Sequence, residues 1–409
     1  MESFSKGFGE MKISVSKIIY LLLSLMVFFI PMEELVGLGD KGSGTLLRYL
    51  GLLNMPLFFF DMLKRKQFHR WAWEQKTFFC FVVWVSFSTI WTHDLSSTQT
   101  LVFTYLSLFL FVWLIISYAD TFSKISSLSI VFIAGCLFSW FLGRASLTGS
   151  AVEDTGYLRY SAGGLDLNDC SFVLNLGCLC TFMQVFLSRS RLRALVFIFI
   201  SMILAYGVMS TGSRAGFYGL SILGLGVAHF LRTRVSKSLF WVLFIPFLLG
   251  AIFILPSTSV WQRASEGTSA STYLLRQKAW TVGLSVWKDV PLQGVGAGAF
   301  VPSTVSITRR ETLVAHNTFV SVLVELGIVG EVLYFSTFIL LLGAGWKQLR
   351  LSKGDSKEEG VYKYFLGLLV FLMFFPAFLS LTFEYKKMLW FAVGMSIACR
   401  RALIYERKI

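Results

Sequence analysis

The chain is divided into long apolar stretches, and this pattern limits what it can fold into more than any other feature of the sequence. A run of about 17 to 25 apolar residues has the length that crosses the hydrocarbon core of a bilayer as a helix. Twelve runs near that length occur, at 18–35, 44–61, 77–91, 101–118, 127–143, 170–187, 194–210, 217–231, 239–256, 317–345, 364–382 and 388–399. We therefore expect an all-α integral membrane protein with about twelve transmembrane helices, forming a single polytopic domain over residues 1–409.

The composition agrees with lipid as the main solvent. Hydrophobic residues make up 55% of the chain and charged residues 15%, whereas about a quarter of a soluble domain is charged. The net charge of +14 is scattered between the apolar runs, so no nucleic-acid partner is expected. The six cysteines show no CxxC spacing, which indicates neither a disulfide framework nor a zinc site. The first run lacks a small-residue cleavage site, so we expect its helix to stay in the mature protein.

The orientation in the membrane follows from Lys and Arg in the short loops, which favour the cytoplasmic side. With the N-terminus inside, the basic residues gather in four cytoplasmic loops and the C-terminal tail, near 64–76, 189–193, 232–237, 347–363 and 400–408. Both termini are then cytoplasmic. The outer face carries the two longest loops, at 144–169 and 257–316.

A few basic residues remain at the outer ends of the helices. Arg214 lies in the turn formed by residues 211–216, Thr-Gly-Ser-Arg-Ala-Gly, which leads directly into a helix. Free backbone N–H groups and the positive end of the helix dipole attract phosphate there, and arginine binds phosphate oxygens in pairs. The alternative is an ordinary helix connection in which Arg214 anchors the chain at the interface. These residues alone leave both interpretations open.

The 257–316 loop is long enough to indicate a function. We expect an amphipathic helix over 274–288, lying along the membrane, because apolar residues recur there at helical spacing: Leu275, Ala279, Val282 and Val286. Trp280 and Trp287 suit the interface. Arg276 would lie at headgroup depth, where it could contact either a substrate or lipid phosphates.

His316 and Asn317 open the long run that follows. Asn317 is a candidate helix N-cap. A helix N-terminus and nearby arginines disfavour the imidazolium form of His316, which leaves it neutral and able to act as a general base; a structural role is the alternative. Glu325 lies about 13 Å further along a helix at the standard rise, too far to orient His316 directly. We expect it to make a buried polar contact to another helix or to support the site indirectly.

Three segments resemble the bacterial O-antigen ligase and O-antigen polymerase superfamily: the 211–216 turn, Arg276 followed by Trp280, and His316-Asn317 followed by Glu325-Leu326-Gly327. The resemblance covers residues 155–335, including Arg159 and Asn168-Asp169. It implies a GT-C-like membrane glycosyltransferase of the bacterial cytoplasmic (inner) membrane, which needs no metal or nucleotide cofactor.

The resemblance also implies the substrates and the site. The donor would be a glycan linked to undecaprenyl diphosphate, and the acceptor a glycan or the lipid A-core sugar, handled among membrane lipids on the outer face. Arg214 and Arg276, with Arg159, would hold the diphosphate, and His316 would activate the acceptor hydroxyl. Ser213, Asn317 and Glu325 would support them.

The residues agree with this chemistry. A diphosphate leaving group needs charge stabilisation, which guanidinium groups and backbone donors can supply. The outer face has no acidic pair typical of a divalent metal site, so we expect metal-independent transfer. We expect a single displacement opposite the diphosphate, which inverts the anomeric carbon. An O-antigen ligase is expected first, and an O-antigen or exopolysaccharide polymerase remains an alternative. A transporter is less favoured, because no internal repeat is evident.

Overall fold

The apolar runs fold into helices because a helix satisfies its own backbone hydrogen bonds where lipid offers none. The computed structural model describes residues 14–33, 46–65, 71–145, 151–154, 157–234, 261, 270–308, 312–350, 357–364, 367 and 370–406. Its α-helices are α1 (Val15–Phe29), α2 (Leu46–Arg65), α3 (Trp73–Phe87), α4 (Leu95–Tyr118), α5 (Phe122–Arg144), α6 (Leu167–Leu187), α7 (Arg191–Ser210), α8 (Arg214–Arg234), α11 (Ala270–Asp289), α12 (Phe300–Thr308), α13 (Thr318–Arg350), α14 (Lys357–Tyr364), α15 (Val370–Ser380) and α16 (Lys387–Glu406). Short 3-10 turns follow α1 (Ile30–Met32) and α3 (Ser88–Ile90).

The chain is an all-α integral membrane protein. Within the described ranges, eight helices are long and apolar enough to cross a bilayer: α1 with its 3-10 turn, α2, α4, α5, α6, α7, α8 and α13. Three further expected runs form helices that fall short of this measure: α3 has 15 residues, α15 has 11, and α16 carries several charges. The run at 239–256 lies outside the described residues.

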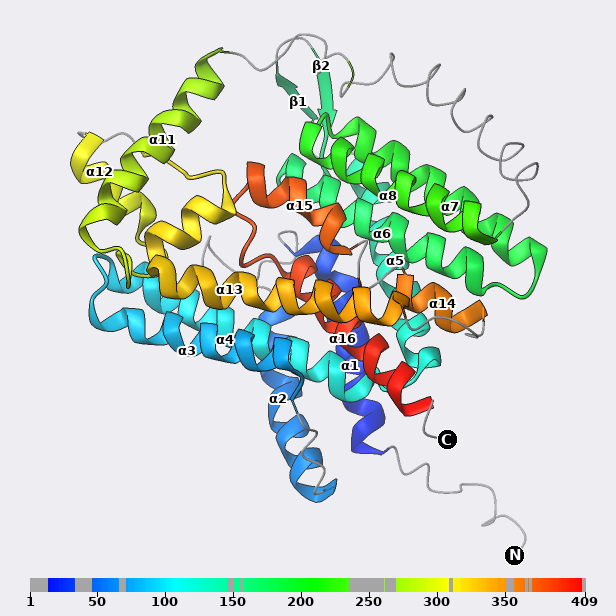
Figure 1. The fold of residues 1–409 in the computed structure, drawn as a ribbon. Coiled ribbons are helices and arrows are strands. Elements are labelled where there is room, and N and C mark those ends of the chain that lie inside the picture. The colour runs from blue at the N-terminus through cyan, green and yellow to red at the C-terminus, as the bar shows by residue number, and fades with distance from the viewer. Residues whose placement is uncertain are drawn as a thin grey trace, which may run out of the picture.

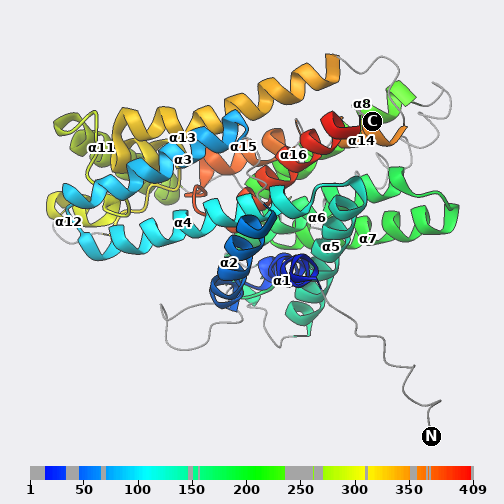
Figure 2. The ribbon, with the colours of Figure 1, turned by 90° about the horizontal axis from the view of Figure 1, so that it is seen from below.

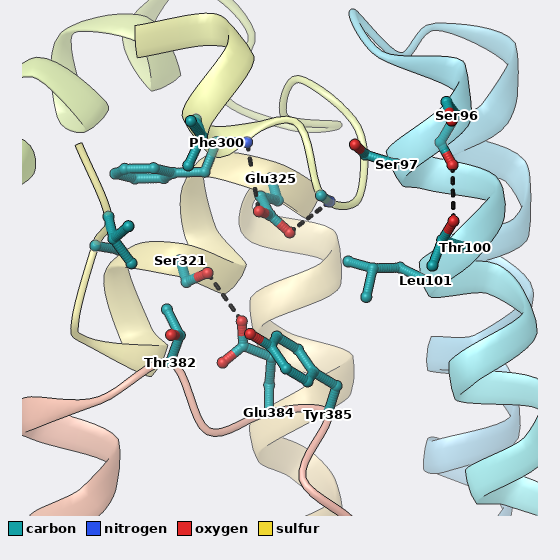
Figure 3. Close-up of a pocket in the computed structure, with 14 residues that line it drawn as sticks. Ser96, Ser97, Thr100, Leu101, Phe300, Ser321, Glu325, Thr382, Glu384 and Tyr385 are labelled. Atoms are coloured by element: carbon teal, nitrogen blue, oxygen red, sulfur yellow. Dashed lines mark hydrogen bonds between the residues drawn. The ribbon is translucent and has the colours of Figure 1, made fainter. Parts of the chain in front are cut away.

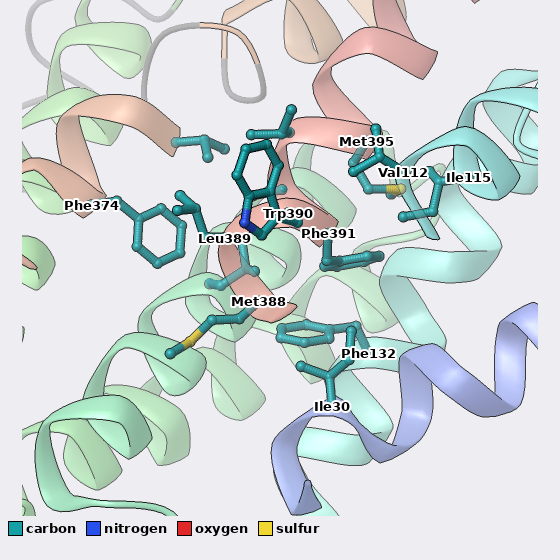
Figure 4. Close-up of a cluster of buried hydrophobic side chains, with 14 of the residues drawn as sticks. Ile30, Val112, Ile115, Phe132, Phe374, Met388, Leu389, Trp390, Phe391 and Met395 are labelled. Carbon is teal, nitrogen blue, oxygen red and sulfur yellow. The ribbon is translucent and has the colours of Figure 1, made fainter. Parts of the chain in front are cut away.

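The centre of the bundle is built from α6 and α16. In α6, 78% of the spanning window is buried, against 50% or less in the other candidate spans. Every residue of α16 from 388 to 399 is buried, which explains why this helix is apolar all round rather than on one face. Trp390 stacks on Phe78 with ring centroids 3.6 Å apart, and Phe391 stacks on Phe132 (Figure 4). The core therefore ties the C-terminal helix to α3 and α5.

The 144–169 region, expected as a loop, contains a small β-hairpin. Strands β1 (Ala151–Asp154) and β2 (Tyr157–Tyr160) pair antiparallel, with Val152 opposite Arg159. The pairing gives this connection backbone hydrogen bonds of its own and fixes the position of Arg159 along the strand.

α13, expected as one continuous span, is broken at Gly327. This residue has φ 67° and ψ −172°, and a Cβ atom there would lie 2.2 Å from the carbonyl oxygen of Leu292, so only glycine fits. The freed carbonyls are satisfied by other parts of the chain. Those of Val324 and Glu325 accept the backbone N–H groups of residues 295 and 296, and that of Leu326 accepts the Trp84 indole N–H (2.9 Å). The break therefore locks the glycine-rich turn at 291–298 against α13.

The described elements of the 257–316 loop lie at one end of the bundle. Figure 1 shows α11 and α12 beside the connection between α3 and α4, with α14 and the end of α16 at the opposite end. Figure 2 gives the same arrangement from a perpendicular direction. The expected amphipathic helix is α11, which buries Ala279 and Val286 but leaves Leu275 57% exposed.

Candidate functional site

The turn at 211–216 connects α7 to α8 and caps the start of α8. Gly212 ends α7 in the left-handed region (φ 67°), and Ser213 is the N-cap of α8, since its Oγ accepts the Gly216 N–H (3.1 Å). The Ser213 N–H is bound in turn by Thr211 Oγ1 (3.2 Å). Arg214 is consequently the first residue of α8. A cation at the positive end of a helix is unfavourable by itself and indicates a site that attracts negative charge.

Arg159 holds this turn from the hairpin. Its side chain is buried, its Nε donates to the carbonyl of Thr211 (2.9 Å), and a Cβ atom on Gly212 would come within 2.8 Å of that Nε. The structure thus places Arg159 directly behind the Arg214 turn. Its contact with a diphosphate stays a prediction.

A second helix N-terminus lies beside the first. Asp166 caps α6 by accepting the N–H of Asn168 (2.8 Å), and the Asn168 side chain donates to the same carboxylate oxygen (3.0 Å). Ser213 Oγ donates to Asn168 Oδ1 (2.8 Å). Ser213 therefore joins the starts of α6 and α8, and a short polar chain runs from the Arg214 turn to Asp166.

Arg276 projects from α11 into the neighbourhood of Arg214. Burial lowers the pKa of Arg276, and the positive charge of Arg214 lowers it further. Arg276 Nε is buried and makes no hydrogen bond to the described residues. Because a guanidinium stays charged in proteins, the repulsion between these two arginines favours an anion bound near both.

His316 lies next to the same charges, in the extended segment that leads into α13. Loss of water lowers its pKa below the usual 6.5, the charge of Arg276 lowers it further, and Asp166 opposes them. His316 also has φ 45°, a conformation that non-glycine residues rarely adopt and that often marks a functional site. The structure therefore gathers Asp166, Arg214, Arg276 and His316 from four separate segments.

The residues after His316 anchor the start of α13. Asn317 is its N-cap, as predicted, since its Oδ1 accepts the Val320 N–H (3.1 Å). Its Nδ2 also donates to the carbonyl of Leu379 (3.3 Å). Thr318 Oγ1 donates to the carbonyl of Leu381 (2.8 Å) and accepts the Phe383 N–H (2.9 Å). These bonds fix the position from which His316 projects.

Glu325 lies apart from the charged cluster. Its two carboxylate oxygens accept the N–H groups of Gly298 (2.8 Å) and Phe300 (3.4 Å), at the start of α12. This is the buried polar contact to another helix that the sequence led us to expect. His93, in the connection between α3 and α4, contacts the Ser303 hydroxyl of α12 through its Nδ1 (3.2 Å).

Sequence reasoning missed two groups of residues near the site. Asp166 had a local signal, because Asp-x-Asn directly before an apolar run is typical of a helix N-cap. The 384–387 segment, Glu-Tyr-Lys-Lys, was missed although it lies between two apolar runs. Lys386 forms an ion pair with Asp169 of α6 (2.5 Å), and this carboxylate raises the pKa of Lys386. No local pattern predicts that pairing, because the two residues are far apart in the sequence.

A cavity of about 350 Å³ lies on the other side of the His316 segment. Val314 and Ala315 form part of its wall, together with residues of α4, α13 and the 382–385 segment. The Trp280 indole N–H donates to the carbonyl of Ala315 (2.7 Å), so α11 fixes the wall between this cavity and the charged cluster. Within the described part of the chain, no three His, Cys, Asp or Glu side chains are placed to hold a metal ion.

Comparison with known proteins finds a family that resembles part of the chain. Residues 199–335 match the model of a family described as O-Antigen ligase, a region that includes Arg214, Arg276, His316 and Glu325 but not Arg159. No curated protein matches the chain. Through residues 199–335, the chain is therefore similar to the O-antigen ligase family.

Proposed function

We propose that this protein transfers a glycan from undecaprenyl diphosphate to a sugar hydroxyl, at the outer face of the bacterial cytoplasmic membrane. The family supports a membrane glycosyltransferase of the O-antigen ligase or polymerase type. The observation that carries the finer proposal is the position of His316, which is electrostatically coupled to both Arg276 and Asp166. A histidine whose pKa is lowered thus lies near Arg276, and Arg276 in turn lies near Arg214.

The diphosphate would bind between Arg214, Arg276 and the N-terminus of α8. The positive end of the α8 dipole and the two guanidinium groups would stabilise the charge that develops on the leaving group. Arg159 would act through the turn that it supports, and the partnerless Arg276 Nε would find an acceptor in a phosphate oxygen. In this proposal guanidinium groups supply the stabilisation that a divalent metal supplies elsewhere.

Transfer would then proceed as a single displacement. The acceptor hydroxyl gives its proton to His316, its oxygen forms a bond to the anomeric carbon, and the bond from that carbon to the diphosphate oxygen breaks. Undecaprenyl diphosphate leaves with the electron pair. Because attack comes from the side opposite the leaving group, the anomeric configuration inverts.

A ligase acting on a lipid A-core sugar and a polymerase acting on a second lipid-linked glycan would use the same residues. We propose the ligase first, with an O-antigen or exopolysaccharide polymerase as the alternative. The break in α13 is a feature that a transporter could also use, since unwound carbonyls can coordinate ions. Here the carbonyls of residues 324–326 are engaged by Trp84 and by residues 295 and 296, which supports transfer over transport.

The test is reconstitution of transfer. Purified protein in nanodiscs would receive lipid-linked glycan extracted from cells that lack this chain, with either lipid A-core or the same lipid-linked glycan as acceptor. We expect one acceptor to be elongated, with the reaction unaffected by EDTA and the product inverted at the new linkage. Absence of transfer to both acceptors would refute the proposal, and activity restored by magnesium after EDTA would refute its metal-independent mechanism.

A further inference from the structure

The cavity beside Ala315 is a pocket formed by several separate parts of the chain. The start of α4, the 298–301 segment, the first turns of α13 and the 382–385 segment surround it (Figure 3). Its volume of about 350 Å³ falls in the range of pockets that bind small ligands, roughly 300–1,000 Å³. None of Arg159, Arg214, Arg276 and His316 lines it, so it is a separate space from the diphosphate site.

Hydroxyl and carboxylate oxygens dominate the polar part of its wall. The hydroxyl groups come from Ser96, Ser97, Thr100, Ser321, Thr382 and Tyr385, and the carboxylates are those of Glu325 and Glu384. Among the described residues, no lysine or arginine lines the pocket, which disfavours a diphosphate there. The two carboxylates favour a ligand that offers hydrogen-bond donors, and the rings of Phe300 and Tyr385 add apolar surface against which such a ligand can pack.

Glu384 is the residue of the pocket that has a carboxylate oxygen without a hydrogen-bond donor among the described residues. Its side chain is only 3% exposed, and its Oε1 accepts the Ser321 hydroxyl (2.9 Å). Its Oε2 is buried and makes no hydrogen bond to the described residues. A buried carboxylate oxygen without a donor is unfavourable, so a ligand hydroxyl in that position would be stabilised. Burial also raises the pKa of Glu384 to about 7.

Glu325 has a different role in the same pocket. Both of its oxygens are used by the N–H groups of Gly298 and Phe300, so it shapes the wall. Glu384 is therefore the carboxylate available to a ligand.

The pocket also lies next to the proposed base. Val314 and Ala315 line it, His316 is the next residue, and the Trp280 hydrogen bond to Ala315 holds this wall in place. A ligand in the pocket would lie beside the segment from which His316 projects.

We propose that this pocket binds a sugar ring of a glycan substrate, with Glu384 Oε2 accepting a hydrogen bond from a ring hydroxyl. This inference rests on the proposed function, and it makes Glu384 a residue that positions the substrate and determines specificity. The sugar belongs either to the acceptor or to the donor glycan, and the kinetic test below distinguishes the two.

The first measurement is a comparison of KM values. Glu384→Gln keeps an acceptor for Ser321 at Oε1 and replaces the partnerless oxygen with a donor group, so the fold should be retained. With extracted lipid-linked glycan as donor, we expect the KM of one glycan substrate to rise about tenfold or more, since the hydrogen bond to Glu384 Oε2 is lost. The KM of the other substrate should stay within about twofold. The substrate that changes identifies the source of the sugar.

Two further variants make the result specific. Tyr385→Phe removes only a hydroxyl from the pocket and should raise the same KM, which tests the site even if Glu384→Gln does not fold. Glu331→Gln is the matched control. Glu331 is a carboxylate residue of α13 and, unlike Glu384, it does not line the pocket. Unchanged KM values for both substrates in both pocket variants would overturn the proposal, and so would an equal rise in Glu331→Gln.

A binding measurement separates this proposal from the transfer reaction. Thr100→Cys, at an exposed position on the pocket wall, would be labelled with a thiol reagent in a Cys80→Ala background. Extracted lipid-linked glycan or lipid A-core should slow the labelling, and Glu384→Gln should abolish that protection. Protection without any transfer would leave the pocket standing and refute the proposed function. Transfer without protection by either glycan would support the proposed function and refute the proposal for the pocket.

Discussion

The indole N–H of Trp280 binds the carbonyl oxygen of Ala315 at 2.7 Å, and this bond joins the helix of Arg276 to the segment of His316. Arg276 lies one helical turn before Trp280 in α11, and His316 directly follows Ala315. The relative position of the proposed base and one proposed diphosphate ligand therefore depends on one hydrogen bond between residues 35 positions apart.

Trp280→Phe tests this link, because it keeps an aromatic ring and removes the N–H. We expect kcat to fall by about tenfold to a hundredfold, since a displaced base is a poor catalyst. The free energy of unfolding should fall by only about 1 kcal/mol. Trp287→Phe is the control, because it loses a similar bond from the same helix to the carbonyl of Pro291 (3.1 Å). Equal losses of kcat in the two variants would show that the Trp280 bond has no special role.

The two arginines of the cluster should require their planar geometry. Arg214→Lys and Arg276→Lys keep the charge but lose paired hydrogen bonding to phosphate oxygens, so each should lower transfer by about tenfold or more at unchanged expression. Arg144→Lys serves as the control, because Arg144 contacts the Tyr160 ring at an interfacial helix end (4.3 Å). Wild-type rates in both cluster variants would leave these arginines as lipid anchors.

His316→Ala should abolish most of the catalysis without unfolding the protein. Loss of a positioned general base reduces transfer by about 10²–10⁴-fold. Asn317 still caps α13 in this variant, so the melting temperature and donor binding should stay near those of the wild type. A specific activity within a few-fold of wild type, measured per folded molecule, would remove His316 from the mechanism.

The pH dependence of transfer gives an independent test of His316. The base acts when neutral and its pKa is lowered below 6.5, so kcat/KM should be constant near neutral pH and fall only at more acidic pH. Asp166 raises this pKa, so Asp166→Asn should move the acidic limb to lower pH, and asparagine still caps α6. An acidic limb in the same place in Asp166→Asn would assign it to another group.

The orientation of the bundle can be tested with single cysteines. Five of the native cysteines are buried, so a Cys80→Ala background should react little with an impermeant thiol reagent. Ser285→Cys on α11 should be labelled in spheroplasts, and Arg189→Cys in the connection between α6 and α7 should not, because basic connections face the cytoplasm. Labelling in the opposite pattern would place His316 on the cytoplasmic side and contradict the proposed reaction.

Part of the site could be predicted from short stretches of sequence. Asn317 and Ser213 are helix N-caps, and a cap is recognised from the few residues that follow it. The position of Arg214 at a helix start could be predicted because the 211–216 turn leads directly into an apolar run. Asp166 has an equally local signal, since its carboxylate caps α6 by accepting the N–H of Asn168.

The sequence by itself determined the membrane-spanning helices, because each apolar run must satisfy its own backbone where water is absent. The tertiary structure alone decided which residues meet. His316 lies near Asp166, and Glu384 binds Ser321 across 63 positions, since helices that are distant in the chain end at the same place. The break at Gly327 is also a tertiary feature, because a helical periodicity continues through that residue and only the approach of Leu292 requires the turn. Local periodicity specifies a helix, whereas packing between helices determines the composition of the site.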